Sequence, residues 1–89
     1  MDDEWRRELL EIRGRALEAS EALEVQAAEV LDLTKRIEEL TDGTPGWYTG
    51  MRTRVEAAET LRQTRVLVRT LEKLDGDANR ASEDAFQDG

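Results

Sequence analysis

Apolar residues between positions 5 and 40 recur at alternating spacings of three and four, in a segment with one glycine and no proline. This heptad spacing is typical of a coiled-coil helix. Its two sets of core positions are Leu9, Ala16, Leu23, Val30 and Ile37, and Trp5, Ile12, Ala19, Gln26, Leu33 and Leu40. The pattern predicts a helix over residues 3–41, about 58 Å long, that packs through these positions.

A second apolar set lies beside this heptad, at Leu10, Leu17, Ala28 and Leu31. Because one partner helix cannot cover both sets, we expect a bundle of three or four helices. Gln26 is the strongly polar member of the heptad. If it is buried, it is a candidate for setting register or oligomeric state, and if it stays partly hydrated it needs no such role. Both interpretations are open.

The segment after residue 41 predicts a tight turn over residues 42–44. Gly43 suits the left-handed position that ends a helix, and Thr44 and Pro45 suit the cap and first position of the next helix. A connection this short makes the second helix, residues 45–74, antiparallel to the first. Its expected seam consists of Ala57, Leu61, Thr64, Val68 and Leu71, with Trp47 and Gly50 in phase.

Asp75-Gly76-Asp77 is predicted to end the second helix. Residues 76–89 then form an acidic, largely flexible tail with a short third helix as an option, in which Phe86 would dock near Trp5 and Leu9. The predicted fold class is therefore all-α: residues 1–75 form a long antiparallel, coiled-coil-like helical hairpin. We expect dimerisation to complete a four-helix bundle, since two helices leave apolar sets uncovered.

Composition narrows the chemistry. The chain has 89 residues, 38% of them hydrophobic and 38% charged, which suits long helices with narrow apolar seams. It contains no cysteine and no histidine, so it lacks the commonest general base, and thiolate and imidazole metal ligands. We therefore expect a protein that is not an enzyme and that binds no metal or other cofactor.

The net charge of −8 is unevenly distributed. Residues 1–42 carry thirteen acids and six bases, whereas residues 43–74 carry three acids and six bases. Basic side chains on the second helix are candidates for gripping phosphates, or for pairing with the first helix, and they are Arg62, Arg65, Arg69 and Lys73. We favour pairing with Glu18, Glu21, Glu24 and Glu29, because nucleic-acid binders usually carry an overall basic excess. The lack of a leader or a long apolar run favours a cytoplasmic protein without membrane contact.

A two-helix chain of this length with tryptophan at the bend resembles the WXG100 family of small secreted helical hairpins. In that family the bend carries Trp-x-Gly, whereas two residues separate Trp47 from Gly50 here. The family's C-terminal Tyr-x-x-x-Asp signal is not matched by Phe86-Gln87-Asp88. The resemblance covers the hairpin architecture and not the motifs, so we assign no family from it.

These observations predict a non-enzymatic structural or protein-interaction function, exercised by a self-associating hairpin, with a homodimer expected and a further protein partner unidentified. The candidate interface residues are Trp5, Leu10, Leu17, Leu31, Trp47, Tyr48, Val66, Leu67 and Leu74. Trp47 and Tyr48 at the tip would contact a partner or staple the turn. The alternative is a small acidic inhibitor of the phage type, which blocks host defence or transcription by occupying a basic groove as a nucleic-acid mimic. Its acidic row would be Glu4, Glu8, Glu11, Glu18, Glu21 and Asp32.

Overall fold

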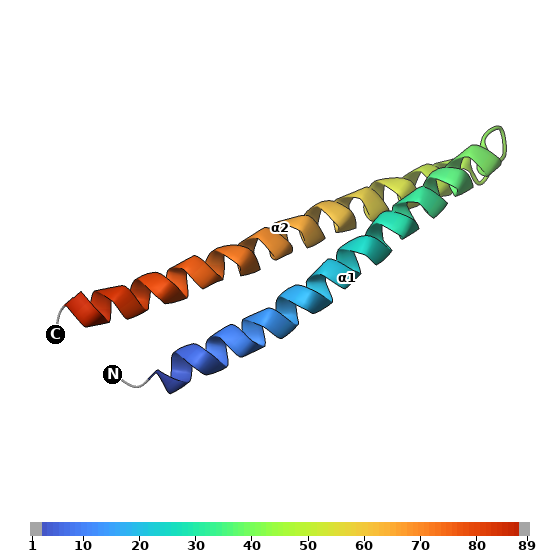
Figure 1. Ribbon diagram of the computed structural model, residues 1–89. Coiled ribbons are helices and arrows are strands. Elements are labelled where there is room, and N and C mark those ends of the chain that lie inside the picture. The colour runs from blue at the N-terminus through green and yellow to red at the C-terminus, as the bar shows by residue number, and fades with distance from the viewer. Residues whose placement is uncertain (1–2, 88–89) are drawn as a thin grey trace.

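The chain folds as two long antiparallel helices joined by a short turn, as the computed structural model shows (Figure 1). Helix α1 spans Glu4–Thr41 and helix α2 spans Trp47–Gln87. The structure describes the backbone of residues 3–87 and the side chains of residues 3–74. The molecule measures 69 × 18 × 12 Å, and residues 3–87 contain no strand. The predicted helical hairpin is confirmed.

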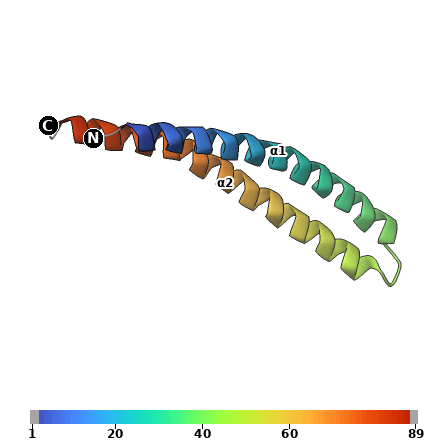
Figure 2. The ribbon, with the colours of Figure 1, turned by 90° about the horizontal axis from the view of Figure 1, so that it is seen from below.

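The two helices cross at a shallow angle rather than running strictly parallel to each other. They separate toward the chain termini in Figure 1 and toward the turn in Figure 2. Such mutual winding is what a heptad seam requires, because 3.5 residues per turn keeps the same face toward the partner helix.

The turn uses the residues that the sequence indicates for it. Gly43 adopts a φ of 76°, the left-handed conformation predicted for it. The Gly46 N–H donates to Thr44 Oγ1 at 3.2 Å, which holds the turn, but Thr44 is not the N-cap that the sequence predicts because α2 does not begin at Pro45. The predicted start of the second helix at Pro45 is two residues early, since α2 begins at Trp47. Boundaries of this kind depend on cap geometry that sequence alone resolves poorly.

The predicted break at residues 75–77 is wrong, because α2 continues without interruption to Gln87. A glycine inside a helix costs only about 1 kcal/mol relative to alanine, and no proline removes a backbone donor there. Each added residue still gains a backbone hydrogen bond. The optional third helix is thus the end of α2, and the packing suggested for Phe86 lies outside the described side chains.

The buried positions of the seam repeat every seven residues on both helices. On α2 they include Leu61, Thr64 and Val68, with Gly50 also buried, which confirms the seam predicted for that helix. On α1 they are Ser20, Ala27 and Thr34, and half-buried Leu10, Leu17 and Leu31 lie between or beside them. The inner face of α1 is therefore built from small residues and from the second apolar set.

The seam predicted for α1 is wrong, because all of its large members except half-buried Leu9 remain exposed to solvent. Their exposed fractions run from 40% to 64% for Trp5, Ile12, Leu23, Val30, Leu33, Ile37 and Leu40. The buried row of Ser20, Ala27 and Thr34 follows Ala19, Gln26 and Leu33 by one residue, which is about 100° around an α-helix. Helix α2 thus covers the flank of the heptad and leaves most of its apolar positions uncovered, whereas Leu9 and Ala16 are half-buried.

The two backbones approach each other closely beside the turn, which favours small residues there. A Cβ atom at Gly50 would overlap Thr41 Oγ1 and would lie 3.4 Å from the Glu38 Cα atom. The buried hydroxyls are satisfied within their own helices: Thr34 donates to the Leu31 carbonyl at 2.7 Å. Small side chains with internally bonded hydroxyls permit tight contact at little desolvation cost, and the predicted heptad, with Leu, Ile and Trp, is too bulky for it.

Candidate interaction surface

The exposed heptad of α1 forms a continuous apolar stripe along the molecule. We call its eleven positions the α1 stripe: Trp5, Leu9, Ile12, Ala16, Ala19, Leu23, Gln26, Val30, Leu33, Ile37 and Leu40. Ten of them are apolar, in a chain that is 38% charged. Leu33 and Leu40 remain 59% and 64% exposed. Scattered exposed apolar residues are normal, but a patch of this regularity marks an interaction site.

A shallow groove runs between the α1 stripe and α2 near the middle of the hairpin. It has a volume of about 230 Å³ and is lined by Leu23, Gln26, Ala27, Val30, Ala57 and Thr60. Its walls carry no charged side chain. The groove and the stripe together therefore form one uncharged surface to which both helices contribute.

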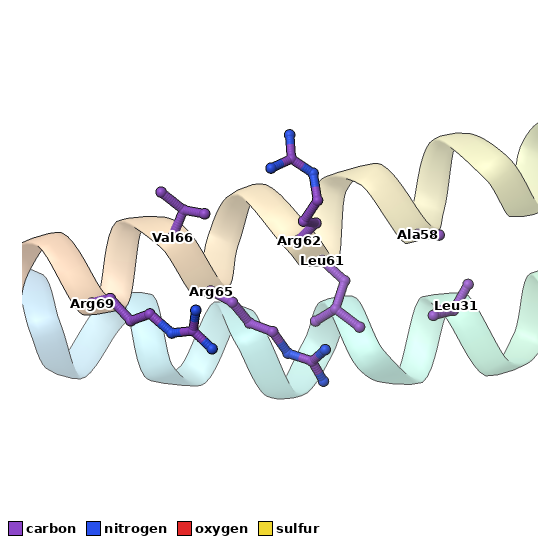
Figure 3. Close-up of a pocket in the computed structure, with 7 residues that line it drawn as sticks. All are labelled: Leu31, Ala58, Leu61, Arg62, Arg65, Val66 and Arg69. Atoms are coloured by element: carbon purple, nitrogen blue, oxygen red, sulfur yellow. The ribbon is translucent and has the colours of Figure 1, made fainter.

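The opposite side of the hairpin is polar and basic. Its groove, about 370 Å³ in volume, is lined by Leu31, Ala58, Leu61, Arg62, Arg65, Val66 and Arg69 (Figure 3). Leu61 points toward α1, whereas Arg62 and Val66 point away from it. The guanidinium of Arg65 extends across α1, and its Nε lies 3.3 Å from Glu24 Oε1. The cross-hairpin pairing expected for Arg65 is thus confirmed.

Arg62 pairs within its own helix instead. Its Nε donates to Glu59 Oε2 at 2.9 Å. This hydrogen bond is the largest cause of a lowered pKa of the Glu59 carboxyl; desolvation opposes it, and the charge of Arg62 adds to it. The same pair raises the pKa of Arg62. The predicted pairing of Arg62 with acids on the first helix is therefore incorrect.

Two further polar contacts hold α1 against α2. Arg54 pairs with Glu38 near the turn, and the Arg13 Nε donates to the Leu71 carbonyl at 2.7 Å near the open end. With Arg65 and Glu24 in the middle, side-chain bonds cross the seam at three levels. These bonds fix the register of the hairpin independently of apolar packing.

The structure separates the predicted interface residues into two groups. Trp5, Trp47, Tyr48, Val66 and Leu67 are exposed, whereas Leu10, Leu17, Leu31 and Leu74 are half-buried. The first three of the half-buried group belong to the inner face of α1. Gln26 is exposed within the stripe and is not buried inside the hairpin. Sequence reasoning placed most of the exposed stripe inside the hairpin, although the heptad spacing itself had identified these residues.

The aromatic residues at the tip do not form a closed staple. Trp47 and Tyr48 are 42% and 61% exposed, and Ile37 and Leu40, their expected packing partners, are exposed as well. Trp47 lines an open groove with Lys35, Glu38, Glu39, Asp42 and Arg54. The tip therefore offers aromatic surface next to charged groups.

No protein-family model, curated protein or solved structure matches this chain. Within the described residues, no three or more acidic side chains converge in a way that would hold a metal ion. Over the same part of the chain, neither helix has an apolar stretch long enough to cross a membrane.

Proposed function

We propose that this protein is a structural or protein-interaction module that works by self-association through the α1 stripe. The observation that carries the proposal is the inverted distribution of side chains on α1. The fully buried residues of α1 are small, and most large residues of its heptad are exposed to solvent. Burial of a leucine, isoleucine or valine side chain contributes about 1.5–3 kcal/mol. A partner that covers the stripe would gain this free energy at each apolar side chain that the hairpin leaves exposed.

The dimensions of the surface agree with a protein interface. From Trp5 to Leu40 the stripe is roughly 53 Å long, and a helix with its side chains is roughly 10 Å wide, giving a footprint of roughly 500 Å². A stable interface buries about 800 Å² on each partner. The groove beside the stripe and exposed Leu67 on α2 supply further area, so that two hairpins pack as a four-helix bundle.

The mass of the protein in solution tests the proposal. Sedimentation velocity and light scattering at micromolar concentration should give a species of twice the chain mass of 10.1 kDa. Dilution should dissociate it, since obligate contacts follow mass action. A stable monomer across this concentration range would remove the basis for self-association.

The acidic outer face of α1 supports a second candidate, an inhibitor that occupies a basic groove. Glu4, Glu11, Glu18, Asp32 and Glu39 are exposed at one heptad position, on the face away from both α2 and the stripe. Charges in a row at regular spacing suit a basic, nucleic-acid-binding groove on a host protein. Binding to such a protein that collapses between low and high salt would favour this function, and salt-insensitive binding would favour the apolar stripe.

A further inference from the structure

We propose that the occupant of the α1 stripe is the same stripe of a second copy, running antiparallel, with the two-fold axis beside residues 19–23. This inference rests on the proposed self-association and adds the identity, direction and register of the partner. Two independent features of α1 select this arrangement over its rivals: side-chain volume and flanking charge.

Side-chain volumes alternate in the required way only when the copies are antiparallel. In the proposed register Ala19 faces Leu23 of the partner subunit, Ala16 faces the partner's Gln26, and Leu9 faces the partner's Leu33. Small side chains thus meet large ones in the middle of the stripe. A parallel, in-register pair would stack Ala16 on Ala16 and Ala19 on Ala19, which leaves two thin layers and a cavity.

Charges along the edge of the stripe are complementary in the same register. The row that borders the stripe on its side away from the seam is exposed and consists of Glu8, Arg15, Ala22, Glu29 and Arg36. Glu8 faces the partner's Arg36, Arg15 faces the partner's Glu29, and Ala22 meets its own copy at the axis. Flanking charges of this kind set the orientation of paired helices.

Rival registers lose these pairs. A slip of one heptad brings Arg15 against Arg36 of the partner subunit. A parallel pair brings Glu8 toward the partner's Arg13, but Arg13 already donates to the Leu71 carbonyl within its own hairpin. The flanking arginines now hold only exposed contacts, at 3.2 Å from Arg15 to Glu11 and 3.0 Å from Arg36 to Glu39. Exposed pairs are weak enough to be exchanged or shared on association.

Gln26 favours the opposite orientation and makes the inference testable. In a parallel pair the two Gln26 amides would meet in one layer and could bond each other, since an amide both donates and accepts. In the antiparallel pair each Gln26 faces an alanine, and the small alanine side chain leaves the amide accessible to solvent. The volume and charge patterns rest on several layers and two kinds of flanking pair, whereas this argument rests on one layer.

The absence of native cysteine allows disulfide mapping with full-length single-cysteine variants, Leu9→Cys and Leu33→Cys. In a glutathione redox buffer, an equimolar mixture should form a mixed disulfide dimer, and neither variant should do so alone. Like positions in the antiparallel pair are 24 residues apart along the axis, roughly 36 Å, whereas a disulfide needs Cα atoms about 4.4–6.8 Å apart. A mixture of Leu9→Cys with Leu40→Cys serves as the control for a one-heptad slip.

The outcomes distinguish a wrong orientation or register from a failure of self-association. Disulfides in each variant alone would establish a parallel dimer, overturning the orientation but leaving self-association in place. A preferred Leu9→Cys to Leu40→Cys disulfide would overturn the register. A dimer without disulfides in any mixture would overturn the stripe-to-stripe contact, and a monomer by sedimentation would overturn the proposed function with it.

A charge exchange gives a second test that needs no cysteine. Glu8→Arg should weaken the dimer about tenfold, because both symmetry-related pairs become repulsive. Adding Arg36→Glu to the same chain should restore the affinity, since every flanking pair is then opposite in sign again. Glu21→Arg, at an exposed position on the side of α1 away from the stripe, is the matched control and should leave the dimer unchanged. If the double variant does not regain the wild-type affinity, the proposed pairing is overturned.

Discussion

Two rows of α1 repeat with the same period, but one is buried in the hairpin and the other is exposed. The inner row, with Ser20, Ala27 and Thr34, is buried against α2. The outer row, with Leu23, Leu33 and Leu40, remains about half exposed or more. The inner row is the less hydrophobic of the two. Burial inside the hairpin therefore does not follow hydrophobicity alone, and the more hydrophobic row is the one left for a partner.

This contrast bears on stability as well as on binding. Within the described side chains, the buried apolar residues are only Ala27, Leu61 and Val68. A chain of this size buries a modest fraction of its surface even when compact. Covering the α1 stripe would therefore stabilise the folded chain by mass action, so that folding and association are coupled.

The largest effect should come from placing a charge in the outer row. Leu33→Asp should raise the dimer dissociation constant at least about 100-fold, because a carboxylate in a desolvated apolar layer costs several kcal/mol. Sedimentation velocity over a concentration series measures it. Val25→Asp is the matched control, since Val25 is 71% exposed on the face that neither α2 nor the stripe uses. Equal dissociation constants for the two variants would show that the rows do not differ in function.

The next effect should come from adding volume to the inner seam. Gly50→Ala should lower the free energy of unfolding by about 1–3 kcal/mol, because overpacking outweighs the gain in helix propensity. The added methyl group would overlap Thr41 Oγ1. Urea denaturation measures the change, and adding Thr41→Ala should recover part of it. A Gly50→Ala protein more stable than the wild type would show that the seam can open without cost.

Alanine substitution should have the opposite effect on stability at Gly14, the other helical glycine within residues 3–74. Nothing lies within 4 Å of a Cβ atom added at Gly14. Gly14→Ala should therefore raise the free energy of unfolding by about 0.5–1 kcal/mol through helix propensity alone. The same denaturation experiment applies. A loss of stability would indicate that a partner approaches α1 at this point.

A smaller effect should come from the polar bonds across the seam. A double-mutant cycle on Glu24 and Arg65, which lie 3.3 Å apart, should give a coupling of about 0.2–1 kcal/mol that declines with added salt. Arg15 and Glu11, an exposed pair within α1, provide the comparison. Coupling between Glu24 and Arg65 that is insensitive to salt would mean that the pair is dehydrated by a covering chain.

The smallest effect concerns Glu59 on the outside of α2. Its hydrogen bond from Arg62 lowers the pKa of the carboxyl, so the ionised pair stabilises the folded state at neutral pH, and this contribution disappears as the pH falls through the lowered pKa. An NMR titration should show Glu59 ionising below the ordinary range of glutamate, and Arg62→Gln should return it toward that range. An unchanged titration in the variant would remove Arg62 as the cause.

The sequence predicted the architecture well and the faces of α1 poorly. Proline and glycine at the turn, together with unbroken helix formers, were enough for the hairpin and for the left-handed Gly43. The heptad of α2 was assigned correctly because its seam includes Leu61 and Val68, which are both apolar and buried. On α1 the largest residues were taken for the core. The error arose because hydrophobic spacing identifies an apolar face without identifying the helix or chain that would cover it.

The continuation of α2 beyond Asp75 has a similar origin. Gly76 between two aspartates reads locally as a stop signal, but a helix of this length tolerates an isolated glycine once it is nucleated. Gln26 illustrates the remaining limit. Its place in the stripe follows from spacing alone, but whether its amide meets water, alanine or another amide depends on the arrangement of two copies.

The closeness of Thr41 and Gly50 also implies an order of assembly. Contacts beside the turn close a short loop, whereas the bond between Arg13 and Leu71 spans 58 residues, and each doubling of loop length adds about 0.6 kcal/mol of entropy cost. Contacts between the helices should form first beside the turn, and backbone amides at the open end should exchange hydrogen fastest. In an antiparallel pair the stable turn end of each copy lies beside the less stable open end of the other. Each protomer therefore stabilises the part of its partner that would open first.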